Sequence, residues 1–506
     1  LNYIDNLKFG IDSVRNADGV VEATICYTGD VSDLSKSKYS LEYYVDLTEQ
    51  LVEHGIDVLA IKDMAGLLKP RAATMLVTAL REKFPDLPIH VHTHDTAGTG
   101  VASMLACAEA GADVVDVCTD ALAGLTSQPA IGALIGSTQG TQHDTGLDMA
   151  KILELNTFWE QTRGLYSPFE SGIKAGSADV YIHEMPGGQY TNLKFQAFSN
   201  GLGSEWDRIK RAYATANEVL GDIVKVTPSS KVVGDLAQFL VANNLDATSV
   251  VEQAETLSFP TSVVEYFQGY IGQPAGGFPE PLRTRVLKGK SQGYATRPGS
   301  EIPDEDLLGL QKSVALKHAR RDVSWRDTLS AAMYPAVFDD YVRKLNLHGP
   351  LTRLPTKAFL VGLEIDEECE IELRAGVLVS VKLKAIGELL PNGNREVFFE
   401  MNGIPRVVEI EDKTEEGSTK KTRLASRERS DPADMGSVGA PMAGNVVEVL
   451  VKEGEEVKAG APLVVLSAMK METTVSPPVD GPVKHIGVVA GDECSAGDLL
   501  VAIDGA

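Results

Sequence analysis

The chain has 506 residues, enough for three or more domains of about 150 residues each, and 43% of them are hydrophobic, as in an ordinary globular protein. Its formal net charge of -24 disfavours nonspecific binding to nucleic acid or to an anionic membrane, and no apolar run approaches the ~20 residues of a transmembrane helix. The five cysteines are scattered and odd in number, which favours a reducing compartment over a disulfide framework.

Residues 1–150 show an α/β pattern. Apolar, strand-like runs alternate with segments of helix length, at residues 21–27, 57–63, 89–95 and 113–119. Two of these runs end in similar turns, Asp63-Met64-Ala65-Gly66 and Asp95-Thr96-Ala97-Gly98, 32 residues apart. This repetition favours part of a (β/α)8 TIM barrel over a doubly wound sheet. Only four βα units are visible, so a closed barrel would need a first half from outside this sequence.

Two histidines on these strands suit a metal site, and a lysine ends the neighbouring strand. Because strand residues alternate between two faces, His92 and His94 project from the same face near the C-terminal strand end, where barrel enzymes build their sites. Two imidazoles can share zinc, manganese, iron or nickel, or they can make hydrogen bonds in a polar barrel interior. His90 shares the face but lies deeper, and we expect it to be structural. Lys62 ends the preceding strand and could bind a substrate, pair with Asp63, or react with carbon dioxide.

Residues 151–345 have a mainly helical pattern. In the segment 221–235, Pro228 restrains a turn, and Ser229 or Ser230 is the candidate N-cap of a helix whose apolar face starts at Val232. Thr227 would lie exposed just before this helix. By pattern alone it is an ordinary loop residue.

Residues 346–410 change character again. Alternating runs at 371–373, 377–383 and 396–401 indicate a small β-rich module. From 411 to 434 the sequence is charged and poor in large apolar residues, which predicts a flexible linker. Its basic runs lack interleaved aromatic residues and the whole chain is acidic, so a nucleic-acid patch is disfavoured.

Residues 435–506 contain one motif twice, at a constant offset of 37. Gly444, Val446, Val451, Gly454, Glu456, Gly460 and Leu463 recur as Gly481, Val483, Val488, Gly491, Glu493, Gly497 and Leu500. Each copy alternates apolar and polar residues between glycine turns, which predicts two similar antiparallel sheets facing one another in an all-β sandwich. Lys470 falls at the connection between the copies, where a hairpin tip can present one amine to a modifying enzyme.

The segment Ala468-Met469-Lys470-Met471 resembles the biotin carrier domain of biotin-dependent carboxylases. In that domain the lysine carries biotin on an amide bond. A lipoyl domain has the same architecture, but it usually flanks its lysine with acidic and small residues. The resemblance therefore implies biotin on Lys470, attached by a biotin protein ligase.

The barrel motifs are similar to the carboxyltransferase domain of the pyruvate carboxylase family. They are Ile-Lys-Asp-Met-Ala-Gly at Lys62 and His-Val-His-Thr-His-Asp at His92 and His94. In that family the lysine is carbamylated and binds a divalent metal ion, zinc or manganese, with both histidines. The family's aspartate ligand and its pyruvate-binding arginine belong to the absent first half. Because the sequence opens at Leu1 without an initiator methionine, signal peptide or transit peptide, we expect a longer parent polypeptide and an isolated chain incomplete for catalysis.

The run Val226-Thr227-Pro228-Ser229-Ser230-Lys231 is similar to the family segment that closes over the transferred carboxyl group. The resemblance implies that Thr227 relays a proton between pyruvate and biotin, and that Ser230 and Lys231 help receive biotin. A relaying hydroxyl accepts one proton while it donates another, so it never bears full charge. Gln189, in a loop that also looks like a family loop, is a weaker candidate for a site contact.

The resemblance covers nearly the whole chain and implies a ligase, in which a carboxyl group passes from carboxybiotin to pyruvate and gives oxaloacetate. The implied parts are half of a barrel (1–150), a helical extension (151–345), a tetramerisation and allosteric module (346–410), a linker (411–434) and a biotin carrier domain (435–506). The implied parent is a homotetramer with a biotin carboxylase domain that uses bicarbonate, ATP and magnesium, and with acetyl-CoA as effector. We expect it in the cytoplasm or the mitochondrial matrix, with the cytoplasm slightly favoured.

Two alternatives remain. An oxaloacetate decarboxylase α-subunit also joins a carboxyltransferase to a biotin carrier, but it runs the transfer from oxaloacetate and docks on membrane subunits. The module at 346–410 and the lack of a Pro/Ala-rich linker argue against it. The other alternative is a non-catalytic carrier or assembly fragment, in which the half-barrel is a remnant.

Overall fold

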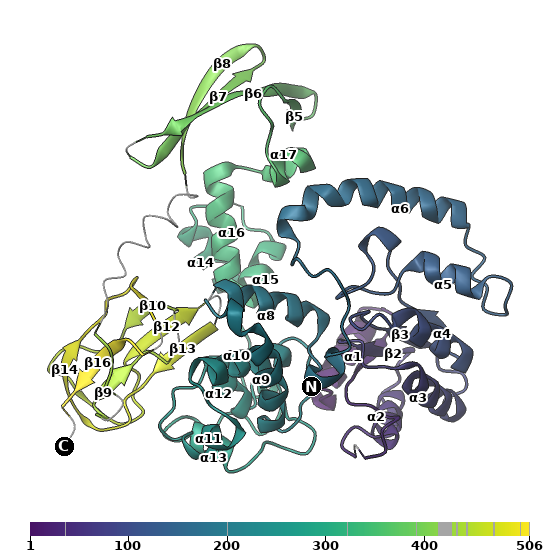
Figure 1. Cartoon of the computed structure of the whole chain (residues 1–506), viewed down its shortest axis with the longest axis horizontal. Helices are drawn as coiled ribbons and strands as arrows, with labels where there is room; N and C mark the ends of the chain where they lie inside the picture. The colour runs from purple at the N-terminus through teal and green to yellow at the C-terminus, as the bar shows by residue number, and fades with distance from the viewer. Residues whose placement is uncertain are drawn as a thin grey trace. The chain divides into compact units, whose positions relative to one another are not determined.

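The structure is a computed structural model that describes residues 1–35, 37–199, 201–320, 322–390, 392–412, 428–431, 434–441, 444–468, 471–495 and 497–504. The chain divides into two compact units (Figure 1). The first comprises Leu1–Gly164, Phe169–Glu301 and Arg427–Ala506, and the second comprises Leu165–Pro168 and Ile302–Ser426. Among the described residues, every helix is too short or too polar to span a bilayer.

A parallel four-stranded sheet opens the first unit. Its strands lie in the order β1 (Glu22–Tyr27), β2 (Val58–Asp63), β3 (Ile89–His92) and β4 (Val114–Val115). The helices of this region are α1 (Ile4–Asn16), α2 (Leu41–Glu53), α3 (Pro70–Lys83), α4 (Gly100–Ala110), α5 (Ile131–Thr138) and α6 (Met149–Arg163). The predicted alternation of strands and helices is confirmed, although β3 ends earlier than predicted and β4 keeps only two residues.

The two faces of this sheet differ in chemistry. One face packs apolar side chains into the largest core, where Ile25, Ile61 and Val91 are fully buried. The opposite face carries Lys62 and His92, which are neighbours across β2 and β3. Successive strand residues point to opposite faces, so the apolar set anchors the sheet while the polar set is left for chemistry.

The helices of residues 180–286 pack around a second core, except the first of them, whose Val180 is buried in the largest core. They are α7 (Val180–His183), α8 (Gly187–Ser199), α9 (Trp206–Val219), α10 (Ser229–Ala242), α11 (Ala247–Glu252), α12 (Thr261–Phe267) and α13 (Leu282–Val286). Short 3-10 turns are η1 (Asp120–Leu122), η2 (Gly164–Phe169), η3 (Gly203–Glu205) and η4 (Pro298–Ser300). The core includes the fully buried Tyr213, Phe239 and Phe267. The predicted helix after Thr227 is confirmed as α10.

The second unit joins helices to an antiparallel sheet. Its elements are α14 (Leu307–Lys317), α15 (Trp325–Met333), α16 (Pro335–His348), η5 (Leu351–Arg353), α17 (Thr356–Leu360), β5 (Glu368–Arg374), β6 (Val377–Leu389), β7 (Asn394–Met401) and β8 (Ile404–Glu411). The sheet order is β5-β6-β7-β8. The sequence pattern missed β8 because its two faces are both exposed and give no alternation of burial. Residues 413–427, most of the predicted linker, lie outside the described residues.

The C-terminal part of the first unit is an all-β sandwich. Its strands are β9 (Ser437–Gly439), β10 (Gly444–Val449), β11 (Glu456–Val457), β12 (Val464–Ala468), β13 (Met471–Val475), β14 (Gly481–Ile486), β15 (Glu493–Cys494) and β16 (Leu499–Ile503). They form two four-stranded antiparallel sheets, β13-β12-β10-β15 and β11-β14-β16-β9. The predicted pair of sheets is confirmed.

The repeat of 37 residues is visible in this sandwich, but the two sheets are not its two copies. The strands β10 and β14 start 37 residues apart, as do β11 and β15. However, β11 of the first copy pairs with β14 of the second, and β15 of the second pairs with β10 of the first. Each sheet therefore contains a strand from the other copy. The repeated Leu463 and Leu500 are both fully buried between them.

Candidate active site

Lys62 and His92 lie opposite each other on neighbouring strands. The register of β2 and β3 pairs Lys62 with His92, and the register of β1 and β2 pairs Cys26 with Lys62. Lys62 and both histidines are half-buried. The ring centres of His92 and His94 are 5.2 Å apart, with the rings edge to face. The sheet thus brings the predicted metal-binding side chains to the same strand ends.

Each of these histidines is anchored through Nδ1. His92 Nδ1 lies 2.7 Å from Asp116 Oδ2, and His94 Nδ1 lies 2.7 Å from the carbonyl oxygen of Thr126. A carbonyl oxygen only accepts hydrogen bonds, so His94 donates from Nδ1, and an ionised Asp116 requires the same of His92. The lone pair of each neutral imidazole then lies on Nε2. Metal-binding histidines are held in this way by a carboxylate or a carbonyl on the far nitrogen.

The surroundings favour neutral histidine and an ionised carboxylate. Burial lowers the pKa of His94 against the opposing hydrogen bond to Thr126, and the charges of His92 and Lys62 add to the lowering. Burial alone would raise the pKa of Asp116, but the hydrogen bonds from His90 and His92 outweigh it and lower that pKa. Both conditions suit a cation site, because a metal ion needs unprotonated ligands.

His90 has a structural position, as its depth in the strand predicts. Its Nδ1 lies 2.9 Å from Glu22 Oε1, and its Nε2 lies 2.8 Å from Asp116 Oδ1. Both ring nitrogens are therefore engaged by carboxylates. These contacts raise the pKa of His90, although burial opposes them.

Asp63 organises the turn after β2. Its carboxylate accepts hydrogen bonds at 2.8–3.3 Å from successive backbone amides, those of Ala65, Gly66, Leu67 and Leu68. The hydroxyl of Thr93 donates to the same carboxylate at 2.8 Å. Asp63 is fully buried, on the face opposite to Lys62. The open possibility that Lys62 pairs with Asp63 is therefore wrong, because the carboxylate is committed to the turn.

The donor set fits part of a metal site. Two Nε2 lone pairs are available as ligands, one on His92 at the end of β3 and one on His94 just beyond it, and Lys62 lies opposite His92. Within the described ranges, no three His, Cys, Asp or Glu side chains converge so that they could hold a metal ion. The set is therefore two imidazoles and a lysine, and the lysine must lose its positive charge to take part.

Thr227 lies exposed in the turn before α10. The hydroxyl of Ser229 accepts the N–H of Val226 at 3.0 Å and donates within the same turn to backbone carbonyl oxygens at 2.6 and 2.7 Å. The prediction that Ser229 or Ser230 caps the helix is wrong, since no side chain makes the cap bond of α10. Ser229 instead closes the turn that presents Thr227. Ser230 is buried.

The first turns of α10 also carry Lys231 and contact Gln189. Lys231 Nζ lies 2.5 Å from Asp235 Oδ2, and burial raises the pKa of Asp235 although Lys231 opposes it. A Cβ atom on Gly234 would lie 2.5 Å from Gln189 Nε2, so the side-chain amide of Gln189 packs directly against the backbone of this glycine. Gln189 of α8 and Lys231 are thus placed on adjoining helices.

The start of α8 touches the histidine pair. Gly187 donates its N–H to the carbonyl oxygen of Met64 at 2.9 Å. A Cβ atom at this position would lie 2.7 Å from His94 Nδ1 and 2.8 Å from the carbonyl oxygen of Thr126. Only glycine permits this approach. The expectation that Gln189 lies in a loop is wrong, since it belongs to the first turn of α8, and that turn lies directly against one candidate metal ligand.

The biotinylation candidate is placed only through its neighbours. The strands β12 and β13 form an antiparallel hairpin in which Ala468 pairs with Met471. Lys470 and Met469, which connect them, lie outside the described residues.

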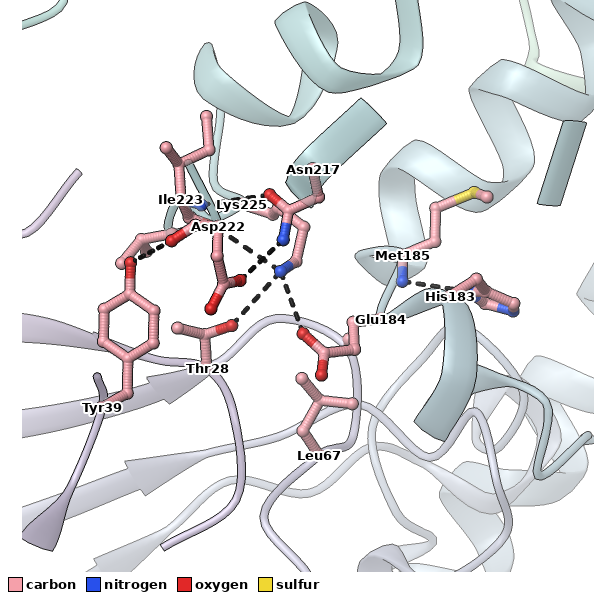
Figure 2. A network of polar contacts seen from close by, with 12 residues as sticks. Thr28, Tyr39, Leu67, His183, Glu184, Met185, Asn217, Asp222, Ile223 and Lys225 are labelled. Atoms are coloured by element: carbon pink, nitrogen blue, oxygen red, sulfur yellow. Dashed lines mark hydrogen bonds and ion pairs between the residues drawn. The ribbon is translucent and has the colours of Figure 1, made fainter. Parts of the chain in front are cut away.

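Sequence reasoning missed the residues that anchor the site. Asp116 and Thr126 hold the histidines, and Lys225 lies buried two residues before Thr227. Lys225 Nζ lies 3.0 Å from Glu184 Oε2 and 3.3 Å from Thr28 Oγ1, within the network drawn in Figure 2. A signal for Lys225 was available, since a lysine within the apolar run 223–226 must find a partner if it is buried.

Three family models match the chain. A model described as HMGL-like matches residues 8–158, one described as a conserved carboxylase domain matches residues 180–382, and one described as a biotin-requiring enzyme matches residues 436–503. Together they reproduce the order of barrel, carboxylase and biotin carrier regions that the sequence motifs indicate.

Curated relatives match over the whole chain. Pyruvate carboxylase 1 of Caenorhabditis elegans is 53% identical over 506 residues, and the mitochondrial pyruvate carboxylase of Homo sapiens is 50% identical over 506 residues. Each match covers 100% of this chain and 42% of the relative. The chain thus spans less than half the length of these relatives.

Solved structures agree in fold. The carboxyl transferase domain of Rhizobium etli pyruvate carboxylase with pyruvate and biocytin is 44% identical with a TM-score of 0.77, and the match covers 82% of this chain and 69% of that one. A complete multifunctional pyruvate carboxylase of the same organism has a TM-score of 0.76 at 42% identity, covering 99% of this chain and 45% of that one. The predicted fold class, a partial barrel with a helical extension and a C-terminal biotinyl sandwich, is confirmed. The chain belongs to the pyruvate carboxylase family.

Proposed function

We propose that the polypeptide containing this chain transfers a carboxyl group from biotin to pyruvate and so forms oxaloacetate. The observation that carries the proposal is the pair of histidines anchored through Nδ1, with His92 opposite Lys62 on the polar face of the parallel sheet and His94 just beyond the strand end. The similar Rhizobium etli domain is described with pyruvate and biocytin, and also with oxalate. These small carboxylates indicate the substrate class that we extend to this chain.

Lys62, His92 and His94 would hold a divalent metal ion, zinc or manganese. When bound, the ion polarises the keto oxygen of pyruvate and makes its methyl protons more acidic. The ammonium form of Lys62 would repel the cation, whereas a carbamate formed with carbon dioxide offers an anionic oxygen. Its place opposite His92 supports this role.

Thr227 would carry the proton. As carboxybiotin releases carbon dioxide, the hydroxyl would accept one proton from the methyl group of pyruvate while it donates its own to the freed ring nitrogen of biotin, so neither charge develops fully. The resulting enolate would then attack the released carbon dioxide and form oxaloacetate. Ser230, Lys231 and Gln189 would receive the biotin ring beside it. Lys231 is already paired with Asp235, which limits how strongly it draws other anions into the site. Water must be kept out, because it would protonate the pyruvate enolate before carboxylation.

Lys470 would carry biotin, which brings the activated carboxyl group on a long arm. The match of residues 436–503 to the biotin-requiring model and the β12–β13 hairpin support this proposal. We propose the five-part division at residues 150, 345, 410 and 434 for the chain. For the parent we propose a biotin carboxylase domain using ATP, magnesium and bicarbonate, an acetyl-CoA response, modification by biotin protein ligase, and a homotetramer in the cytoplasm or mitochondrial matrix.

The test captures the full-length polypeptide on avidin and measures the ATP-dependent fixation of labelled bicarbonate into oxaloacetate with pyruvate. Lys470→Ala should abolish both biotin attachment and fixation. Lys484→Ala is the matched control, because Lys484 is an exposed lysine on β14 of the same sandwich.

Biotin attachment without fixation would overturn the assignment. Sodium-dependent breakdown of oxaloacetate would then identify a decarboxylase subunit, and its absence a carrier or assembly fragment. Fixation that persists in Lys470→Ala would show that another group carries the carboxyl.

A further inference from the structure

A buried lysine joins three segments that are far apart in the sequence. Lys225 is 1% exposed, and its ammonium lies 3.0 Å from Glu184 Oε2 and 3.3 Å from Thr28 Oγ1 (Figure 2). Thr28 follows β1, Glu184 follows α7, and Lys225 precedes the turn that presents Thr227. The contact therefore ties a barrel strand end, a helix end and the Thr227 turn together.

The pair fixes where its segments lie. An ammonium removed from water needs a close counter-charge and further acceptors, and such a pair tolerates little displacement. The Glu184 side chain is 16% exposed and lines a cavity of about 390 Å³, whereas that of Lys225 is 2% exposed. The Glu184 carboxylate is thus the main counter-charge of the buried Lys225 ammonium and fixes its position.

The Glu184 side of the pair leads to a candidate metal ligand. Glu184 ends α7 with φ 52°, in the left-handed region, and the N–H of Met185 donates to His183 Nδ1 at 3.0 Å. Two residues later, Gly187 lies against His94 with room for no side chain. A displacement of Glu184 would therefore be transmitted through a short, buried turn to His94.

The Lys225 side of the pair leads to the proposed proton relay. The N–H of Val226 is held by the Ser229 hydroxyl at 3.0 Å, and that hydroxyl also bonds to the carbonyl oxygen of Val224 at 2.7 Å. The backbone on both sides of Lys225 is thus closed into the turn that ends at Thr227. The position of the ammonium sets the position of this turn relative to the strand ends.

We infer that Lys225 and Glu184 are positioning residues for carboxyl transfer, which hold the Thr227 turn in register with His94. The inference rests on the proposed function and assigns the pair no contact with substrate. A shift of about 1 Å in a reacting group can cost on the order of 100-fold in rate. Loss of the pair should therefore lower the transfer rate while leaving pyruvate binding close to normal.

The experiment uses the full-length biotinylated polypeptide and compares Lys225→Met, Glu184→Gln and the double variant. With Lys225→Met, kcat for oxaloacetate formation should fall about 10- to 100-fold, and KM for pyruvate should change by less than about 3-fold. The double variant should be no worse than Lys225→Met, because two positions that act as one unit are not additive. Each single variant leaves one buried charge without its partner and can unfold the protein for that reason. The double variant removes both charges, so it should remain folded even if a single variant does not.

Two controls separate the outcomes. Bicarbonate-dependent ATP cleavage without pyruvate should stay at the parent rate, which shows that the rest of the polypeptide is intact. Leu287→Ala opens the same helical core at a fully buried position, and it should lower Tm but keep kcat.

If the parent polypeptide fixes no bicarbonate, the proposed function fails and the inference falls with it. If the parent is active and the folded double variant keeps its kcat, the positioning role alone is overturned. A rise in KM with unchanged kcat would also overturn it, since that result would make the pair part of substrate binding. If Leu287→Ala lowers kcat as much as the double variant does, the ion pair contributes only to the stability of the fold, and the positioning role is overturned.

Discussion

Replacing Asp116 with asparagine is expected to weaken metal binding while keeping the sheet folded. Asp116 Oδ2 accepts from His92 at 2.7 Å, and Oδ1 lies 2.8 Å from His90 Nε2. Asparagine preserves the size of the side chain but removes the charge that makes His92 a stronger donor to a cation. The carboxylate partner of a metal-binding histidine is typically worth about 10- to 100-fold in affinity, or about 1.4–2.7 kcal/mol.

The assay titrates the metal-free, full-length polypeptide with Mn²⁺ or Zn²⁺ by calorimetry in the presence of a competing chelator. Glu22→Gln is the matched control, because Glu22 contacts the other ring nitrogen of His90, at 2.9 Å, within the same network. We expect its affinity to stay within about 3-fold of the parent, which is below the about 10-fold loss expected of a ligand's partner. Unchanged affinity in Asp116→Asn would show that Asp116 does not prepare His92 for metal binding, and an equal loss in both variants would indicate general loosening of the strand ends.

Three further outcomes follow from buried groups. Asp63→Ala leaves four backbone amides without their acceptor at a fully buried position, at about 1 kcal/mol each. Urea titrations should show a fall in the free energy of unfolding on the order of 4 kcal/mol. An unchanged midpoint of urea unfolding would show that Asp63 does not stabilise the turn. Burial lowers the pKa of His183 to about 4, below its unfolded value of about 6.5, so the unfolded chain binds more protons than the folded chain between these pH values. The free energy of unfolding should therefore be full above about pH 6.5 and fall by up to about 3 kcal/mol as the pH drops towards 4. Urea titrations at several pH values should show a flatter pH dependence for His183→Asn. Leu463→Ala and Leu500→Ala should destabilise the sandwich by similar amounts, about 2–5 kcal/mol each, in hydrogen-exchange measurements of its strands; a large effect of only one would show that the two copies are packed differently.

The parallel sheet and the strand ends of the site were predictable because they depend on local patterns. Apolar runs separated by helix-length segments predicted the four strands, and alternation predicted that His92 and His94 lie together. Their rings do lie together, although β3 ends at His92. The partners of these histidines were not predictable in the same way. Thr126 acts through its backbone carbonyl, which has no sequence signature, and Asp116 becomes a partner only because β4 lies beside β3.

The turn before α10 shows why a local rule can fail. Serine next to a helix start is a common N-cap, and the rule pointed to Ser229 or Ser230. In the structure the Ser229 hydroxyl accepts the N–H of Val226 and donates to nearby carbonyl oxygens in the preceding turn. The helix therefore starts without a side-chain cap. Burial decided the outcome, since this hydroxyl had to satisfy groups inside the turn.

The exchange of β11 and β15 between the two sheets makes the carrier sandwich indivisible. A chain that stops after the first copy leaves β10 without β15 and β11 without β14, so neither sheet is complete. The two copies of the repeat can therefore fold only together. A modifying enzyme that recognises the folded β12–β13 hairpin would then act only after β16 has been synthesised, so modification would wait for strands that follow the modified segment.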